Sequence, residues 1–180
     1  ICRDVFCAEE GYEIVEIDQS QIELRVAALL SGDAVMIKVF QDDGDVHLYA
    51  AKKMAIKQKM PQAEVDVMTK QHPLRAQIKT GVFGALYGEP PEGLAAKWKI
   101  SKREAQQLQP EILGQFPQLR DWCRAQVAPA RRTGYCYTYW DGLPYRRRLL
   151  TEIASPDEKI RASAERSSWN TPIQGTAAEY

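Results

Sequence analysis

The chain has 180 residues, the length of one ordinary domain, and its 24 basic and 24 acidic side chains give a formal net charge of zero. That balance excludes a polybasic, histone-like protein and an acidic disordered chain. No apolar run approaches the roughly 18 residues of a membrane span, and no basic-then-apolar leader opens the chain. Four scattered cysteines without a Cys-x-x-Cys pair favour a reduced cytoplasmic protein over a disulfide-rich or zinc-binding one.

The net charge of zero is a cancellation between unequal parts of the chain. Residues 1–50 carry 11 acidic and 3 basic side chains, so the remaining 130 residues have a net charge of +8. An acidic part beside a basic part suits a protein that holds both a metal ion and a polyanion. Solvated helix faces produce the same asymmetry, so charge alone leaves both interpretations open.

The hydrophobic pattern predicts a mostly helical α+β chain that starts with a strand. Apolar and polar side chains alternate over residues 11–18, which is typical of a strand that ends near Asp18. Ser20, with Glu23 three residues later, has the capping-box pattern. It predicts a helix that ends at residues 31–33, where a serine and a glycine precede an aspartate.

Helical periodicity dominates the rest of the chain, with one β-rich interruption. The pattern predicts helices at about 34–41, at 46–57, from Pro61, at 74–87, two within 91–128, and one at 157–171, where Pro172 interrupts it. Residues 135–140 are β-rich and meet an Asp-Gly turn. This turn predicts a hairpin with the arginine-rich residues that follow it.

Two of the predicted elements carry residues suited to metal and phosphate chemistry. A carboxylate at the end of a strand, as predicted for Asp18, suits a hard cation such as magnesium, although aspartate there is more often a helix cap or turn former. In the 74–87 helix, a four-residue spacing places two cations and two aromatics on one face: Arg75, Lys79, Phe83 and Tyr87. Cations suit nucleotide phosphates and aromatics suit base stacking, but an ordinary amphipathic helix fits this pattern too.

Two later segments offer a nucleic-acid surface. Arg166, Asn170 and Gln174 also lie four residues apart and share a helix side if the helix continues past Pro172, so they offer hydrogen bonds to phosphates and base edges. Residues 120–150 interleave seven arginines with six aromatics, a composition typical of nucleic-acid binding. A solvated polar face and a protein interface remain alternative interpretations.

In this order, the patterns resemble the polymerase motifs of family A DNA polymerases, the DNA polymerase I-like group. Residues 18–25, Asp-Gln-Ser-Gln-Ile-Glu-Leu-Arg, are similar to the family's first motif. Residues 75–88 are similar to the nucleotide-binding helix of the fingers, and residues 166–178 resemble the segment just before the third motif. An Asp-Val-His segment at residues 45–47 matches an Asp-Ile-His segment between the first two motifs.

The resemblance implies part of a right-hand polymerase fold, namely the fingers and part of the palm. Residues 1–30 would belong to the palm, residues 31–154 to the fingers, and residues 155–180 to the return into the palm. The implied reaction is template-directed addition of deoxynucleotides to a primer 3′ end by two-metal phosphoryl transfer, in DNA replication or repair. Primer–template DNA and deoxynucleoside triphosphates would be the partners. The full-length protein would be a monomer in the cytoplasm of a bacterial or phage-infected cell.

The resemblance also implies roles for single positions. Asp18 and the carbonyl of Gln19 would bind two magnesium ions, and Lys79 would be a catalytic residue that protonates the leaving pyrophosphate. Glu23 would reject a ribose 2′-hydroxyl. The whole nucleotide-binding set would be Gln21, Glu23, His47, Arg75, Lys79, Phe83 and Tyr87. The DNA-binding set would be Arg166, Asn170 and Gln174.

Two substitutions depart from the family's usual pattern. Gln19 replaces the usual tyrosine, and Gly81 with Val82 replaces the usual Ile-Asn pair. We interpret the glycine as making the nucleotide-binding helix easier to bend, since glycine is unfavourable within a helix. Neither substitution changes a charged residue of the motifs.

The ends of the chain lead us to expect a fragment of a larger protein. The chain starts with Ile1 rather than methionine and stops at Tyr180, before the family's His-Asp-Glu motif with its second metal-binding aspartate. We therefore expect the chain to be inactive by itself. The alternative is a non-catalytic nucleic-acid-binding module derived from a polymerase, which the intact Asp18, Lys79 and Phe83 disfavour.

Overall fold

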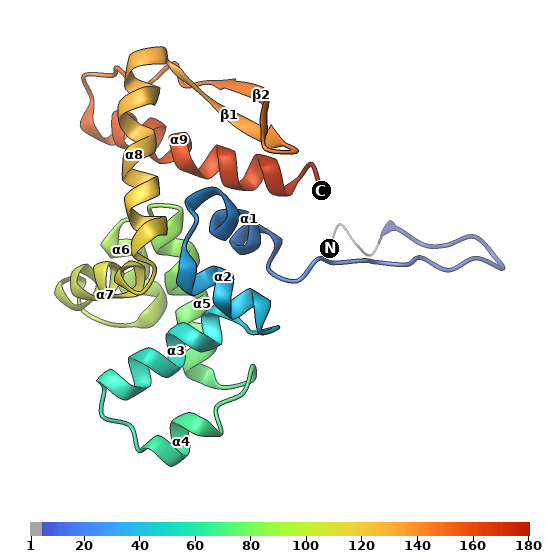
Figure 1. Ribbon diagram of the computed structural model, residues 1–180, viewed down its shortest axis with the longest axis vertical. Helices are drawn as coiled ribbons and strands as arrows, with labels where there is room; N and C mark the ends of the chain where they lie inside the picture. Colours follow the sequence, from blue (N-terminus) through green and yellow to red (C-terminus); the bar gives the residue numbers. More distant parts are fainter. Residues whose placement is uncertain (1–4) are drawn as a thin grey trace.

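The computed structural model describes residues 5–180, apart from the side chains of Phe83 and Ala85, and confirms a mostly helical α+β fold (Figure 1). This part contains nine helices and one antiparallel hairpin of two strands. Their bounds are α1 Ile22–Ser31, α2 Ala34–Gln41, α3 Val46–Lys57, α4 Gln62–Asp66, α5 Pro73–Leu86, α6 Pro91–Trp98, α7 Lys102–Gly114, α8 Pro117–Thr133, β1 Tyr135–Trp140, β2 Leu143–Leu149 and α9 Glu158–Ala177. No helix in the described range is long and apolar enough to cross a membrane.

The long helix α8 joins two groups of elements (Figure 1). In the first group, α5 packs against α3, α6 and α7, and α4 packs against α3. In the second group, β1 lies on α9, which also packs against α1 and α8. The segment that precedes α1 extends away from both groups.

One hydrophobic core runs through both groups. Its buried side chains come from eight helices and include Leu24, Met36, Ala50, Val65, Ile78, Ile112, Leu119 and Ile173. In α5, Ile78, Val82 and Leu86 recur at a four-residue spacing and face this core. The neighbouring stripe of α5 therefore stays at the surface, where Lys79 is exposed and Arg75 is half-buried.

The buried carboxylate of Asp33 caps two helices at once. Its Oδ1 accepts hydrogen bonds from the backbone N–H groups of Val35 and Met36 in α2, both at 3.1 Å. Its Oδ2 accepts one from the N–H of Leu119 in α8, also at 3.1 Å. The first turn of a helix has N–H groups without partners inside the helix, and negative charge is favourable there. Asp33 thus joins two helix starts that are 86 residues apart in sequence.

Several predicted elements are confirmed. α2 and α3 occupy the predicted residues 34–41 and 46–57, and the aspartates Asp33 and Asp45 cap them. The hairpin also forms, with antiparallel pairing between β1 and β2. Its turn residues Asp141 and Gly142 have φ angles of 49° and 76°, the positive values that a tight hairpin turn requires.

The strand predicted over residues 11–18 is wrong. This segment has no regular secondary structure, pairs with no strand within residues 5–180, and leaves Tyr12, Ile14 and Ile17 exposed. Alternation produces a strand only where a neighbour pairs with the backbone and covers the apolar side chains. The two strands of the described chain pair with each other instead.

The capping box predicted at Ser20 is also wrong. α1 begins after Gln21, which adopts the left-handed region with φ of 56°, and no side chain caps the helix. This left-handed residue separates Ser20 from the first helical turn. A capping box forms instead between Ser101 and Glu104 at the start of α7. Residues 91–128 consequently contain three helices where periodicity predicts two.

Pro172 does not interrupt the last helix, contrary to prediction. α9 continues from Glu158 to Ala177, although proline removes one backbone hydrogen bond from the helix interior. Thr171, Pro172 and Ile173 are buried where α9 packs against α1 and β1, and this burial outweighs the loss.

We expect Asp33→Ala to lower the free energy of unfolding by about 2–4 kcal/mol, because it leaves buried N–H groups of two helices without an acceptor. Urea denaturation measures this change. Asp42→Ala is the control, since the ion pair of Asp42 with Lys38 is exposed and should contribute less than about 1 kcal/mol. Equal losses in the two variants would contradict the capping role of Asp33.

Candidate functional site

The centre of the candidate site is an ion pair between the start of α3 and α5. Asp45 caps α3, where its Oδ1 accepts a hydrogen bond from the N–H of Leu48 at 2.7 Å. Arg75 of α5 donates through Nη2 to Oδ2 at 2.6 Å and through Nε to Oδ1 at 3.3 Å. Burial by itself raises the pKa of the Asp45 carboxyl, but the hydrogen bonds from Arg75 and Leu48 and the arginine's charge hold that pKa below its usual value.

His47 lies beside this ion pair and is neutral at physiological pH. Its side chain is 1% exposed, and its Nδ1 is 3.8 Å from Oδ1 of Asp45. Burial lowers the pKa of His47 to about 4. The charge of Asp45 raises this pKa, but the charges of Arg75 and Lys79 lower it further. The sequence-predicted residues Arg75 and His47 thus lie against Asp45, and the charge of Lys79 acts on His47.

Gln21 connects the residues of the first motif to this cluster. Its Oε1 accepts a hydrogen bond from the N–H of Val46 at 3.2 Å, at the start of α3. Glu23, in the first turn of α1, is partly buried, and that burial raises the pKa of its carboxyl. Residues 18–25 and residues 45–47 are therefore neighbours in space.

Asp18 and Gln19 lie on the exposed segment before α1. The carbonyl of Gln19 accepts a hydrogen bond from the N–H of Ile22 at 3.2 Å, and its side-chain amide donates to the carbonyl of Tyr180 at 3.4 Å. Carboxylate and carbonyl oxygens are the ligands that magnesium prefers, so the donor atoms fit this ion. No group of three or more metal-ligating side chains gathers anywhere in residues 5–180.

The other two predicted rows meet at the end of α5. Tyr87 lies in the turn just beyond α5, and its carbonyl accepts a hydrogen bond from Nδ2 of Asn170 at 3.3 Å. Asn170 shares the continuous helix α9 with Arg166 and with the exposed Gln174. The side chain of Phe83 lies outside the described part of the structure. The nucleotide-binding and DNA-binding rows predicted from sequence are thus adjacent.

Gly81 has a packing role in α5. A Cβ atom there would lie 2.8 Å from Cζ2 of Trp98 and 2.8 Å from Cδ1 of Ile112. The missing side chain therefore lets α6 and α7 approach α5 closely. This close approach accounts for the glycine without invoking a bend in the helix.

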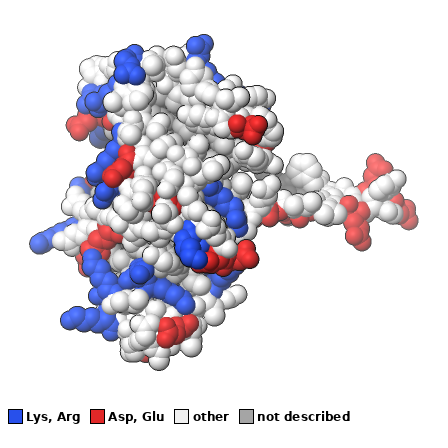
Figure 2. Space-filling model, viewed as in Figure 1, with Lys and Arg blue, Asp and Glu red and all other residues white. Residues whose placement is uncertain are grey.

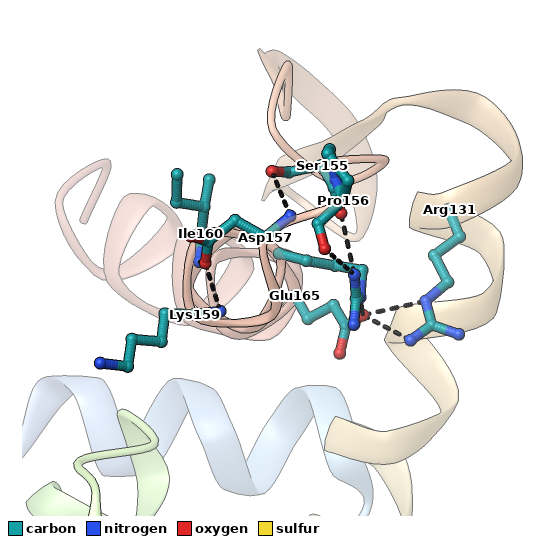
Figure 3. A network of polar contacts seen from close by, with 8 residues as sticks. Arg131, Ser155, Pro156, Asp157, Lys159, Ile160 and Glu165 are labelled. Atoms are coloured by element: carbon teal, nitrogen blue, oxygen red, sulfur yellow. Dashed lines mark hydrogen bonds and ion pairs between the residues drawn. The ribbon is translucent and has the colours of Figure 1, made fainter.

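Two arginines of the 120–150 segment contact α9, and one of them, Arg131, is drawn in Figure 3. Arg131 of α8 donates from Nε to Glu165 of α9 at 3.0 Å, near the start of α9, which Asp157 caps. Arg148 of β2 donates from Nη1 to Oγ1 of Thr171 at 2.8 Å. These two arginines position α9, so composition alone overstates the basic surface that this segment offers.

Charge is distributed unevenly over the surface (Figure 2). The segment that precedes α1 carries acidic side chains and, over residues 5–18, no basic one. Lysines and arginines gather instead on the helical body. This extended segment therefore carries part of the acidic excess of residues 1–50, whereas Asp45, from the same acidic part, lies in the helical body and pairs with Arg75.

Comparison with known proteins places the chain in a family. A family model described as DNA polymerase family A matches residues 1–180. The chain belongs to this family. The thermostable DNA polymerase I of Thermus aquaticus is 38% identical over 177 residues, which cover 98% of this chain and 20% of that protein. DNA polymerase I of Mycobacterium bovis is 36% identical over 178 residues, which cover 98% of this chain and 18% of that protein.

A solved structure agrees with this family assignment. The POL domain of Pol1 from M. smegmatis, in complex with DNA primer-template and dNTP, superposes with a TM-score of 0.75 at 38% identity. The match covers 90% of this chain and 26% of that chain. The chain spans about a fifth of the length of the curated relatives it matches.

Sequence reasoning missed two residues of this family A site. Asp45 enters the sequence argument only as part of a matched segment, although it orients Arg75 from 30 residues away. Trp169 donates a hydrogen bond to the carbonyl at the end of α5, and no periodic pattern singles it out. The one available signal was an aspartate placed directly before the predicted helix at 46–57, which is typical of a helix cap.

We expect stability to fall as the pH is lowered from about 6.5 to about 4. In this window the unfolded chain protonates His47 while the folded chain keeps it neutral, so the loss reaches at most about 3 kcal/mol. The lowered pKa of Asp45 adds its own loss only at still lower pH. Urea denaturation across this range should give a flatter profile for His47→Gln. Parallel profiles for the two proteins would contradict the buried, neutral state of His47.

Proposed function

We propose that this family A chain is the palm-and-fingers segment of a template-directed DNA polymerase. The polymerase would add deoxynucleotides to a primer 3′ end in DNA replication or repair. The observation that carries the proposal is the hydrogen bond between Asn170 and the carbonyl of Tyr87, which joins the α5 row to the α9 row. A helix suited to phosphates is thereby attached to a helix suited to a nucleic-acid strand.

In this proposal α5 and its neighbours hold the incoming nucleotide. Arg75 and Lys79 would bind the triphosphate, and the Asp45 carboxylate fixes the direction of the Arg75 guanidinium beforehand. His47, being neutral, would offer a hydrogen bond rather than a charge. The proposed nucleotide-binding set also includes Gln21, Glu23, Phe83 and Tyr87. Lys79 would donate the proton to the leaving pyrophosphate.

Magnesium is the proposed cofactor, with Asp18 and the carbonyl of Gln19 as its ligands in this chain. Two bound ions would activate the primer 3′-hydroxyl and neutralise charge on the leaving pyrophosphate. Because no group of three or more metal-ligating side chains gathers around Asp18 within the described residues, we propose that further ligands come from elsewhere in the complete enzyme. We therefore propose that the 180-residue chain does not extend primers by itself.

The wider assignments follow from the same proposal. Residues 1–30 and 155–180 would belong to the palm and residues 31–154 to the fingers, and α9 would contact the template and primer through Arg166, Asn170 and Gln174. The proposed complete protein acts as a monomer in the cytoplasm of a bacterial or phage-infected cell. The competing proposal is a nucleic-acid-binding module without catalysis. Such a module would need no metal-binding carboxylate, so the presence of Asp18 disfavours it.

Replacement of Asp18 tests the proposal in the complete polymerase. We expect Asp18→Asn to abolish primer extension, because an amide cannot supply the negative charge that magnesium requires. The affinity for primer–template DNA, measured by fluorescence anisotropy, should change less than about threefold, since the proposed DNA contacts come from the α9 side chains rather than from Asp18. Glu13→Gln, on the same exposed segment, is the matched control.

Full extension by Asp18→Asn would refute the metal assignment. Loss of extension in both Asp18→Asn and Glu13→Gln would assign the effect to the charge of the segment rather than to a metal ligand. A complete protein that binds primer–template DNA but extends no primer would favour the competing binding module.

A further inference from the structure

Two side chains of α9 hold the carboxyl end of α5, and the sequence patterns assign no role to one of them, Trp169. The indole Nε1 of Trp169 donates a hydrogen bond to the carbonyl of Leu86, the last residue of α5, at 2.7 Å. Asn170 does the same for the next carbonyl, that of Tyr87. The last four carbonyls of a helix have no partner inside the helix, so outside donors fix its end. Both donors come from 83 residues further along the chain.

The chain makes this contact close by placing a glycine in the turn. Gly88 has a φ angle of 66°, and a Cβ atom at this position would lie 1.9 Å from Cδ of Arg166. Glycine suits this position, because side chains rarely adopt such a φ angle and a Cβ atom would force the Arg166 side chain to move. Arg166 and Trp169 lie three residues apart on one face of α9, so that face rests directly on the end of α5.

The hydrogen bond of Trp169 links the two groups of elements. Elsewhere α5 packs against α3, α6 and α7, whereas α9 packs against α1, α8 and β1. Trp169 also lines a cavity of about 600 Å³, together with Leu86 and Leu113. The indole ring therefore borders open space on one side, where packing does not fix its orientation. Its N–H hydrogen bond to the carbonyl of Leu86 fixes that orientation instead.

We infer that Trp169 is a positioning residue for the incoming nucleotide. Its hydrogen bond sets the angle between α5 and α9. That angle fixes where Arg75 and Lys79 stand relative to a template and primer held by α9. The inference rests on the proposed polymerase function, because the bound nucleotide and DNA belong to that proposal.

Two tryptophans that contact α5 allow a matched pair of variants. Trp169→Phe keeps an aromatic ring against the cavity and removes only the N–H donor. Trp98→Phe makes the same change at a tryptophan that packs against Gly81 of α5, and Nε1 of Trp98 meets no acceptor within the described residues. The two variants therefore separate loss of the hydrogen bond from loss of indole bulk.

Single-nucleotide incorporation by the complete polymerase gives the first measurement. Trp169→Phe should raise the KM for the deoxynucleoside triphosphate about fivefold, the factor that one net hydrogen bond supports, with kcat and primer–template affinity within about twofold of wild type. Trp98→Phe should leave this KM within about twofold. An unchanged KM in Trp169→Phe, or an equal rise in both variants, overturns the inference.

Hydrogen exchange gives a second measurement that needs no activity. The N–H of Glu89 donates to the carbonyl of Gly84 at 2.7 Å, at the end of α5, and should exchange faster in Trp169→Phe than in wild type or Trp98→Phe. Unchanged exchange overturns the inference whatever the kinetics. If the wild-type protein extends no primer, the proposed function fails, and the exchange rates still decide whether Trp169 fixes the end of α5.

Discussion

The ion pair between Asp45 and Arg75 is the interaction on which the arrangement of the site depends. One buried carboxylate caps α3, binds the guanidinium of α5 with both oxygens, and lies beside His47. Removal of one partner from such a pair leaves an uncompensated charge in a buried place, which is costly. The pair therefore fixes α3 against α5, and with it the surface stripe that contains Lys79. Gln21, in the first motif, is connected to the same cluster because its side chain accepts a hydrogen bond from the backbone N–H of Val46 in α3.

The candidate site is held at its other end by α9. Arg166, Trp169 and Asn170 all belong to α9. Asp157 caps this helix, and Arg131 of α8 forms an ion pair with its Glu165. The chain thus anchors α5, which carries Arg75 and Lys79, at its start through Asp45 and at its end through residues of α9. A helix anchored at both ends presents its cations in one direction, which lowers the reorganisation needed when an anion binds.

Helices and turns that depend on neighbouring residues in the sequence could be predicted from the sequence. The helices at 34–41 and 46–57 and the Asp-Gly hairpin follow from caps, periodicity and turn residues, and they form as predicted. The pattern of serine followed by glutamate three residues later occurs at Ser20 and at Ser101, yet only the second forms a capping box, because Gln21 turns left-handed after the first. The strand at 11–18 failed for lack of a partner, and Pro172 was accommodated by burial. The contact between Trp169 and Leu86 could not be predicted from the sequence, because these residues lie 83 positions apart and meet only when the helices pack.

A double-mutant cycle on Asp45 and Arg75 tests the central claim that Asp45 acts on the nucleotide through Arg75. The quantity to measure is kcat/KM for single-nucleotide incorporation by the complete polymerase carrying Asp45→Asn, Arg75→Gln or both. The claim predicts that each single variant loses at least about tenfold and that the double variant is no worse than Arg75→Gln alone, because the two residues share one function. Losses that multiply in the double variant would contradict it and would show that Asp45 and Arg75 act independently.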